Sequence, residues 1–164
     1  MSYRNKTYVT FDADTDIKMY RIMTAWKEND KIDFDFHNAH DLNNLRDGST
    51  EQTIKKKLRE RLKNTKQMIV LVGEKTKNLF KFVRWEMEIA LEMGIPIIAA
   101  NLDKKNDSTN KTPAILKDNA YFVNVPFEMK KIRYALDNFP SEFAREKSNA
   151  PSSRNYDWSK IKLD

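Results

Sequence analysis

Two short apolar segments constrain the fold of this chain more than any other feature of its sequence. Residues Gln67–Gly73 contain Met-Ile-Val-Leu-Val, and residues Ile95–Ala100 are apolar throughout, with Pro96 near their start. Continuous apolar runs of this length are typical of strands that are buried on both faces of a parallel sheet. Between them lies Leu79–Met93, a segment of helical periodicity that stops at Gly94, a residue suited to the left-handed position after a helix. The three segments predict a strand–helix–strand crossover unit.

The rest of the chain continues this alternation of strands and helices. The other predicted strands are residues 6–11, 32–36 and 120–125, and the other predicted helices are about residues 15–27, 49–63 and 126–138. Asp14 or Thr15 is the predicted cap of the first helix, Ser49 that of the second, and Pro126 lies in the first turn of the last. Strands joined by helices of this length form a parallel sheet with helices on both faces, so the sequence predicts an α/β fold.

The length of the chain, 164 residues, is close to that of one domain. We therefore assign residues 1–140 to a single domain. Residues 141–164 form a tail rich in Ser, Asn and Pro, but it also carries aromatic residues such as Tyr156 and Trp158. These apolar side chains predict that the tail packs back on the same domain.

The composition excludes several classes of protein. The absence of cysteine removes thiol nucleophiles, cysteine zinc sites and iron–sulfur clusters. Two histidines, His37 and His40, are too few for a histidine-rich metal centre, so we predict no metal site. Three glycines exclude both the Gly-x-Gly-x-x-Gly fingerprint and the P-loop. The N-terminal segment does not resemble a secretion signal, and no apolar run reaches the ~20 residues of a membrane helix. We therefore expect a cytoplasmic protein without membrane contact.

Much of the net charge of +6 lies in one segment, residues 55–63. Apolar residues recur there at helical spacing, so the lysines and arginines form the outer face of an amphipathic helix. No aromatic residue interleaves the run, although stacking on aromatic rings is typical of single-stranded nucleic-acid sites. The pattern favours a solvated helix face, and nucleic-acid binding remains the weaker alternative.

Position 86 breaks the apolar face of the helix predicted over Leu79–Met93. At about 100° per residue, Arg84, Glu88 and Glu92 share a polar stripe, whereas Glu86 lies on the opposite side among apolar residues. A carboxylate in such a place must find a partner, shift its pKa or line a cavity. Ligands in α/β sheets bind beyond the carboxyl ends of the strands, where this helix begins. The pattern is open to two interpretations, a catalytic carboxylate and a glutamate that is hydrogen-bonded inside the core.

Residues Thr76–Ala90, which follow an Ile-Val-Leu-Val-Gly strand, resemble the third-helix region of TIR domains. More specifically, they resemble the stand-alone bacterial TIR-like proteins of the Thoeris anti-phage type. Phe82 and Glu86 match the family's aromatic residue four positions before a glutamate, and Thr10-Phe11-Asp12 matches its aromatic-containing first strand. The resemblance spans residues 6–125. It implies a flavodoxin-like, TIR-type fold with a five-stranded parallel sheet in the order 2-1-3-4-5.

The resemblance also implies an NAD⁺-consuming enzyme in which Glu86 is catalytic. NAD⁺ is then the substrate, no cofactor is bound, and the product is an ADP-ribose species, often cyclic, that reaches an effector by diffusion. One carboxylate suits this chemistry, because it can stabilise positive charge that builds on the ribose. Glycosidases need a second carboxyl group to protonate their leaving group, whereas nicotinamide leaves a cationic pyridinium as a neutral molecule.

Other residues near the carboxyl ends of the predicted strands are candidates for contact with this substrate. They are Phe11, Asp12, Asp14, His37, Asn38, Lys75 and Trp85. Each has a structural alternative. Phe11 and Trp85 are also suited to the core, Asp14 to a helix cap, and Lys75 to an ordinary exposed surface. His37 and Asn38 are equally consistent with a solvated loop.

One departure from the family pattern keeps a second function open. Many TIR domains carry Pro-Gly in the loop after the second strand, and no such pair occurs between His37 and Gly48. The alternative to an enzyme is an interaction module, which associates with itself, another TIR domain or an effector protein. A glutamate at position 86 favours the enzyme, because an interaction module would more readily carry Gln or an apolar residue there.

Overall fold

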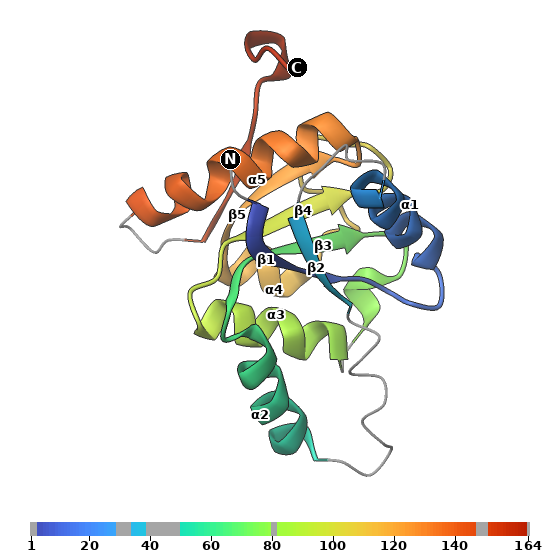
Figure 1. The fold of residues 1–164 in the computed structure, drawn as a ribbon, viewed down its shortest axis with the longest axis vertical. Helices are drawn as coiled ribbons and strands as arrows, with labels where there is room; N and C mark the ends of the chain where they lie inside the picture. The colour runs from blue at the N-terminus through green and yellow to red at the C-terminus, as the bar shows by residue number, and fades with distance from the viewer. Residues whose placement is uncertain (1–2, 29–33, 39–49, 80–81, 147–150, 164) are drawn as a thin grey trace.

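The computed structural model describes the backbone of residues 3–28, 34–38, 50–79, 82–146 and 151–163 (Figure 1). Within these residues, six strands form one parallel sheet in the order β2-β1-β3-β4-β5-β6. The strands are β1 Tyr3–Thr10, β2 Phe34–Asn38, β3 Thr65–Val72, β4 Ile97–Asn101, β5 Tyr121–Pro126 and β6 Ser152–Asn155. The first five follow the order 2-1-3-4-5, so the predicted flavodoxin-like, TIR-type fold is confirmed.

Helices cover both faces of this sheet (Figure 1). α1 Ile17–Glu28 and α5 Met129–Arg145 lie on one face, and α2 Glu51–Leu62, α3 Phe82–Glu92 and α4 Ala114–Asn119 lie on the other. The buried apolar side chains of the described residues form two clusters, one under each group of helices. Two short 3-10 helices, η2 Thr76–Asn78 and η3 Trp158–Lys160, complete the described elements.

The side chains of β1, and of Phe11 directly after it, alternate between the two clusters. Val9 and Phe11 pack toward α1 and α5, whereas Tyr8 packs toward α2 and α3. Thr10 follows Tyr8 at the two-residue spacing of a strand, so it lies on the same face as Tyr8. This alternation decides which residues of β1 reach the helix that carries Glu86.

The last helix differs from its prediction at both ends. Pro126 is the final residue of β5, paired with Asn101, and not part of the first helical turn. α5 then continues through Pro140 to Arg145, although proline removes one backbone hydrogen bond from a helix. Leu136 and Phe139 are buried on the sheet, and this apolar packing outweighs the local cost of Pro140.

Several other boundaries also differ by a few residues. β2 is described over residues 34–38, two residues beyond the predicted end at 36, and residues 32–33 of the predicted strand lie outside the described part of the chain. α3 begins at Phe82 in place of Leu79. α2 is capped by Thr50, whose side chain accepts from the Thr53 backbone N–H, and the predicted cap Ser49 lies outside the described residues. Gly94, at φ +69°, does occupy the left-handed position that the sequence predicts.

The C-terminal tail contributes an element that the sequence did not predict. Its residues Ser152–Asn155 form β6, which pairs in parallel with β5 as the sixth strand. Beyond it, the Tyr156 hydroxyl donates to Glu142 at 2.9 Å, and Trp158 Nε1 donates to Asn106 Oδ1 at 2.8 Å. The tail thus contacts both α5 and the segment after β4. In the described part of the chain, no helix has the length and apolarity that a membrane span requires.

Candidate functional site

Glu86 lies inside the protein, between α3 and the sheet. α3 buries Val83, Met87 and Ala90 against the sheet, and Glu86 lies among them on the same side of the helix. Only 2 % of its surface is exposed. The helical periodicity of the sequence therefore placed this carboxylate on the correct face.

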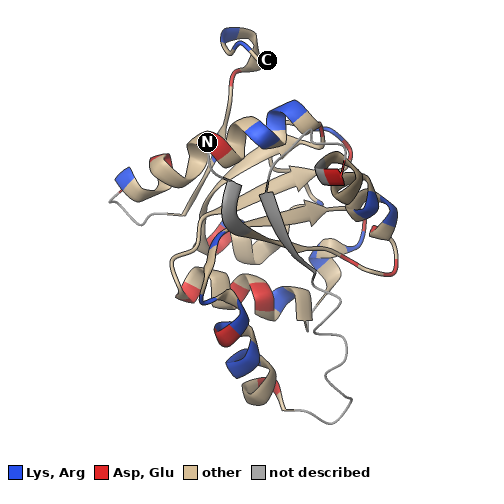
Figure 2. Ribbon diagram, viewed as in Figure 1, with Lys and Arg blue, Asp and Glu red and all other residues tan. Residues whose placement is uncertain are grey.

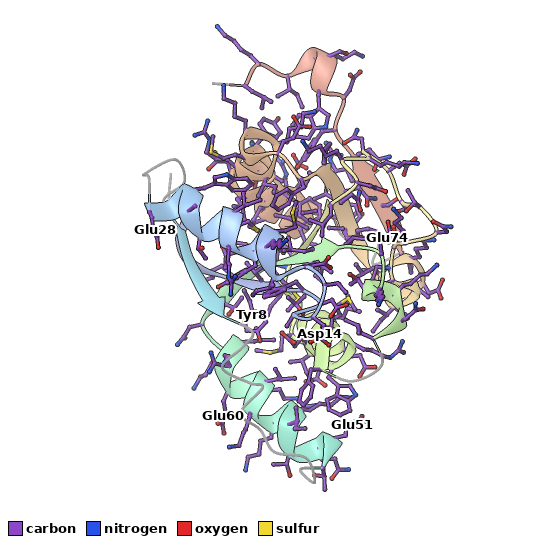
Figure 3. The ribbon with its side chains drawn as sticks, turned by 90° about the vertical axis from the view of Figure 1, so that its right-hand side faces the viewer. Tyr8, Asp14, Glu28, Glu51, Glu60 and Glu74 are labelled. Carbon is purple, nitrogen blue, oxygen red and sulfur yellow. The ribbon has the colours of Figure 1, made fainter. Side chains whose placement is uncertain are left out.

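Two hydroxyl groups of β1 act on the Glu86 carboxyl. Tyr8 lies in the interior of the sheet face that α2 and α3 cover (Figure 3), and Thr10 is on the same face. Burial raises the pKa of Glu86 to about 8, because desolvation disfavours its charge. The hydroxyls of Tyr8 and Thr10, followed by the positive charge of Arg61 on α2, oppose this rise in pKa. Glu86 is thus held close to the point at which it can take up or release a proton near neutral pH.

One oxygen of this carboxyl group, Glu86 Oε2, is buried without a hydrogen bond of normal geometry from the described residues. A buried oxygen of this kind is costly unless some group satisfies it. The arrangement can hold a hydroxyl group or stabilise a positive charge at Oε2, which are the two tasks expected of a catalytic carboxylate.

Phe11 lies away from this carboxyl group. It is 3 % exposed, belongs to the cluster under α1 and α5, and stacks on Tyr20 with ring centroids 4.7 Å apart. Glu86 is on the opposite face of the sheet. This placement favours the core interpretation of Phe11 over contact with a substrate.

Asp12 and Asp14 form the turn after β1. The Asp12 carboxylate accepts from the Asp14 backbone N–H at 3.1 Å and from the Thr15 hydroxyl at 2.8 Å. α1 itself begins after Asp16, whose carbonyl accepts from the Tyr20 backbone N–H. The predicted cap at Asp14 or Thr15 is therefore wrong by one or two positions, because the Asp12 turn shifts the start of the helix.

His37 and Asn38 are the last residues of β2, paired with Tyr8 and Val9, and do not follow the strand as the sequence predicted. Their side chains lie outside the described part of the structure, so their proposed contact with substrate stays a prediction. Lys75 is exposed just before η2. Its role also stays a prediction.

Trp85 is half-buried next to Glu86. Its ring meets that of Phe82 edge to face, with centroids 5.6 Å apart, and packs against the cluster under α2, α3 and α4. Trp85 and Glu86 lie in the same turn of α3. The contacts of the Trp85 ring are those of a core residue, so they favour the core interpretation of Trp85.

Sequence reasoning missed Tyr8, Thr10 and Arg61, the groups that act on Glu86. The two-residue period of the first strand would have placed Tyr8 and Thr10 on one face, opposite Phe11. No local pattern points to Arg61, because α2 reaches Glu86 only through tertiary packing.

Two basic residues of helix α2, Lys55 and Arg59, are paired with acidic residues of its neighbour α3. Figure 2 shows its lysines and arginines along the helix surface. Lys55 contacts Glu88 at 2.6 Å, and Arg59 contacts Glu92 through two hydrogen bonds of 2.5 and 2.9 Å. These pairs between α2 and α3 give the basic run a structural role. They support the solvated-face interpretation over nucleic-acid binding.

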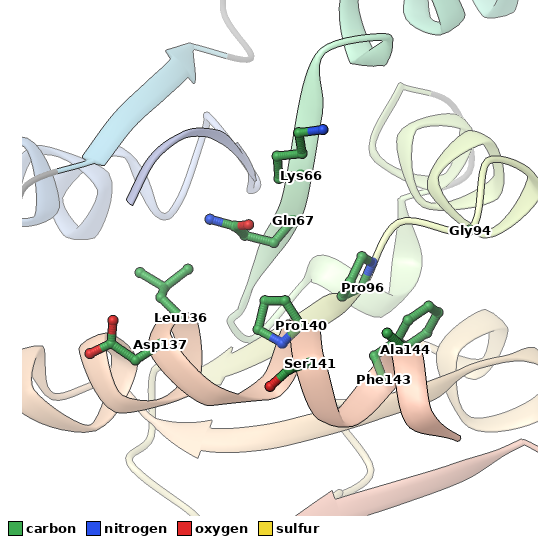
Figure 4. Close-up of a pocket in the computed structure, with 10 residues that line it drawn as sticks. All are labelled: Lys66, Gln67, Gly94, Pro96, Leu136, Asp137, Pro140, Ser141, Phe143 and Ala144. Carbon is green, nitrogen blue, oxygen red and sulfur yellow. The ribbon is translucent and has the colours of Figure 1, made fainter. Parts of the chain in front are cut away.

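A cavity of about 660 Å³ lies at the amino edge of the sheet. Its lining comes from the start of β3, the turn before β4 and the second half of α5 (Figure 4). None of the candidate site residues lines it, so it is separate from the Glu86 carboxyl. Among the described residues, no group of three or more His, Cys, Asp or Glu side chains is arranged to hold a metal ion.

Comparison with protein-family models identifies the family to which the chain belongs. A family model described as the TIR-like domain of Thoeris protein ThsB matches residues 8–107. The chain belongs to this TIR-like family. The match covers more than half of the chain and runs from β1 through β4, so it includes Tyr8, Thr10 and Glu86. This TIR-like chain is accordingly a protein of the Thoeris defence type, in a family compatible with NAD-related activity.

Proposed function

We propose that this TIR-like protein cleaves the nicotinamide–ribose bond of NAD⁺, with Glu86 as its catalytic residue. The observation that carries the proposal is the buried Glu86 carboxyl, whose Oε2 has no hydrogen-bond donor of normal geometry among the described residues. The product is an ADP-ribose species, and we favour a cyclic isomer that diffuses to an effector. NAD⁺ serves as the substrate, and no resident cofactor is required.

The chemistry needs Glu86 in its ionised form. As the bond from ribose C1′ to the nicotinamide nitrogen breaks, its electron pair leaves with nicotinamide, which becomes neutral. Positive charge then develops on the ribose, and an adjacent carboxylate stabilises it in a site of low polarity. Water completes hydrolysis with loss of a proton, whereas attack by an adenine nitrogen of the same molecule completes cyclisation.

The cationic nicotinamide ring of the substrate also favours the ionised carboxylate. An opposite charge within about 4–6 Å lowers the pKa of a carboxyl group. The pKa of Glu86, raised to about 8 by burial, would therefore fall when substrate binds. Tyr8 and Thr10 act in the same direction, because their hydroxyls favour the charged form.

Nicotinamide release from NAD⁺ tests this proposal, with the native chain, Glu86→Gln and Glu88→Gln compared. Glu88 is the matched control because it lies on the same helix but pairs on the surface with Lys55 and Arg84. We expect release by the native chain and by Glu88→Gln, and at least ~10²-fold less by Glu86→Gln. The mass of the product distinguishes hydrolysis from cyclisation, because the two products differ by one water.

Two results would overturn the proposal that this protein is an enzyme. Equal release by the native chain and Glu86→Gln would remove Glu86 from the mechanism. No release by the native chain, either purified or in a lysate of phage-infected cells, would favour the interaction module. In that case the Glu86 carboxyl would be a core group hydrogen-bonded within the fold.

A further inference from the structure

The cavity at the amino edge of the sheet takes no part in the proposed catalysis. Its volume of about 660 Å³ falls within the ~300–1,000 Å³ typical of ligand pockets. It lies between the start of β3, the turn before β4 and the second half of α5 (Figure 4). Glu86 belongs to α3, which covers the other face of the sheet from α5. A ligand in this cavity would therefore be distinct from the substrate of Glu86.

Gln67 presents a hydrogen-bond acceptor to this cavity. Its side chain is 4 % exposed, and because Gln67 lines the cavity, this small exposed part faces it. Gln67 Nε2 donates to the hydroxyl of Thr7 on β1 at 2.6 Å, whereas no described residue donates to Gln67 Oε1. A deeply buried amide oxygen without a donor is costly unless a bound group satisfies it. The cavity thus has a specific, unfilled hydrogen-bonding position.

The wall formed by α5 adds further acceptors. Pro140 has no backbone N–H, so the Leu136 carbonyl four residues earlier lacks its ordinary helical donor. Both residues line the cavity. Asp137, next to Leu136, has an Oδ1 that is buried without a hydrogen-bond partner among the described residues. Acceptors therefore outnumber donors here, and a ligand must bring N–H groups of its own.

The charges of the lining favour a neutral ligand. Lys66 and Gln67 are consecutive in β3, so their side chains point to opposite faces of the sheet, and Figure 4 shows them pointing apart. The Ser141 hydroxyl already donates to Asn138 O at 3.0 Å. An anion would thus meet the Asp137 carboxylate without an opposing cation. An ammonium group would lose its hydration against Gln67 Oε1, which carries no compensating charge.

The apolar part of the lining suits a flat ring. Pro96 contributes its ring from the turn before β4, and Pro140 and Phe143 contribute theirs from α5 (Figure 4). Leu136 and Ala144 complete this apolar surface. Ligand pockets typically combine such a lining with a few polar groups that fix the orientation of the ligand. A planar ring carrying one neutral N–H donor matches both parts of this cavity.

We propose that this cavity binds a small neutral heteroaromatic carboxamide, whose amide N–H donates to Gln67 Oε1 and whose ring lies among Pro96, Pro140 and Phe143. Nicotinamide, the leaving group of the proposed reaction, has this chemistry. Binding involves no chemical step, and it does not depend on Glu86.

Titration of the full chain with nicotinamide, followed by backbone amide NMR spectra, tests the proposal. We expect saturable shifts of the signals of Gln67, Ser141 and Ala144, with a dissociation constant on the order of 1 mM for so small a ligand. Nicotinate is the matched ligand control, because it has the same ring with a carboxylate in place of the carboxamide. It should bind at least ~10-fold more weakly, since it offers no N–H to Gln67 and is repelled by Asp137.

Two variants test the cavity itself. Gln67→Met keeps the length of the side chain, removes the amide and should weaken binding at least ~10-fold. Because this change also removes the partner of the Thr7 hydroxyl, Ala144→Phe provides a second test at an exposed position. Its ring should fill the edge of the cavity and abolish the shifts. Arg145→Phe is the matched control, since Arg145 is also exposed but does not line the cavity.

The outcomes separate this site from the proposed catalysis. Glu86→Gln should bind nicotinamide at Gln67 as the native chain does, even if neither protein cleaves NAD⁺. Absence of saturable shifts up to tens of millimolar, or equal shifts in Ala144→Phe, would overturn the site. Shifts confined to α3 would instead assign nicotinamide to the surroundings of Glu86 and also overturn it. Tighter binding of the pyridine that carries an aminomethyl group in place of the carboxamide would refute the neutral ligand.

Discussion

Replacing Glu86 by Gln should make the folded protein more stable at alkaline pH, and the gain should grow with pH. The native carboxyl is 2 % exposed, and burial raises its pKa from 4.5 to about 8. Gln has nearly the same shape and polarity as protonated Glu, but it cannot ionise. The variant therefore keeps the packing of α3 and removes only the cost of a buried charge.

The magnitude follows from proton linkage. Between pH 4.5 and about pH 8, the folded chain holds the Glu86 proton and the unfolded chain has lost it. Because the folded state then binds more protons, its stability falls as pH rises, by up to about 1.4 kcal/mol per pH unit. Over the whole interval the loss comes to about 5 kcal/mol, and it levels off above the folded pKa. Glu86→Gln should be free of this loss.

Urea unfolding followed by circular dichroism, from about pH 5.5 to about pH 8.5, measures the difference. The free energy of unfolding of Glu86→Gln minus that of the native chain should increase with pH up to about pH 8 and then level off. Glu88→Gln is the control. Burial tends to raise the pKa of Glu88, but hydrogen bonds from Lys55 and Arg84 lower it overall, so Glu88 stays ionised throughout. A difference for Glu86→Gln that is constant with pH would refute the raised pKa and the reasoning built on it.

Three further predictions concern activity and the tail. If NAD⁺ is cleaved through ionised Glu86, kcat/KM should rise with pH and level off above about 8, and a profile without this rise would contradict the assignment. Tyr8→Phe removes a hydroxyl that lowers the pKa of Glu86, so it should move this profile to higher pH; an unmoved profile would show that Tyr8 does not act on the carboxyl. Asn106→Ala breaks side-chain hydrogen bonds to Tyr156 O and Trp158 Nε1, and should lower the free energy of unfolding by about 1–3 kcal/mol. Limited proteolysis should then cleave its tail sooner than that of the native chain, and unchanged cleavage would mean that the remaining contacts, β6 pairing and the Tyr156–Glu142 hydrogen bond among them, hold the tail.

Local periodicity determined the strand–helix alternation and the side of the helix that carries Glu86. Continuous apolar runs marked β3 and β4 because strands buried on both faces have no polar alternation. Gly94 marked the end of the third helix region through its freedom to adopt positive φ. Glu86 stood out because one acidic residue interrupted a stripe that is otherwise apolar. Each of these signals depends on neighbours within a few residues, which a sequence displays directly.

Contacts between distant segments were decided only by the tertiary structure. The sequence predicted that the last helix ends near residue 138, but burial of Phe139 on the sheet keeps α5 intact through Pro140. The tail strand β6 is polar and exposed, and only its hydrogen bonds to β5 define it as a strand. Such contacts form between residues that no local pattern relates.

The same distinction, between what a local pattern shows and what tertiary contacts decide, holds for buried carboxyl groups. The sequence by itself determined that a carboxylate lies on the buried face of α3. Only the packing of β1 and α2 brought Tyr8 and Arg61 to it, and only the meeting of α1 with β3 set the Asp16 carboxyl over Gly73. The physical reason is that desolvation and charge act through space, so the environment of a buried carboxyl depends on every element packed against it.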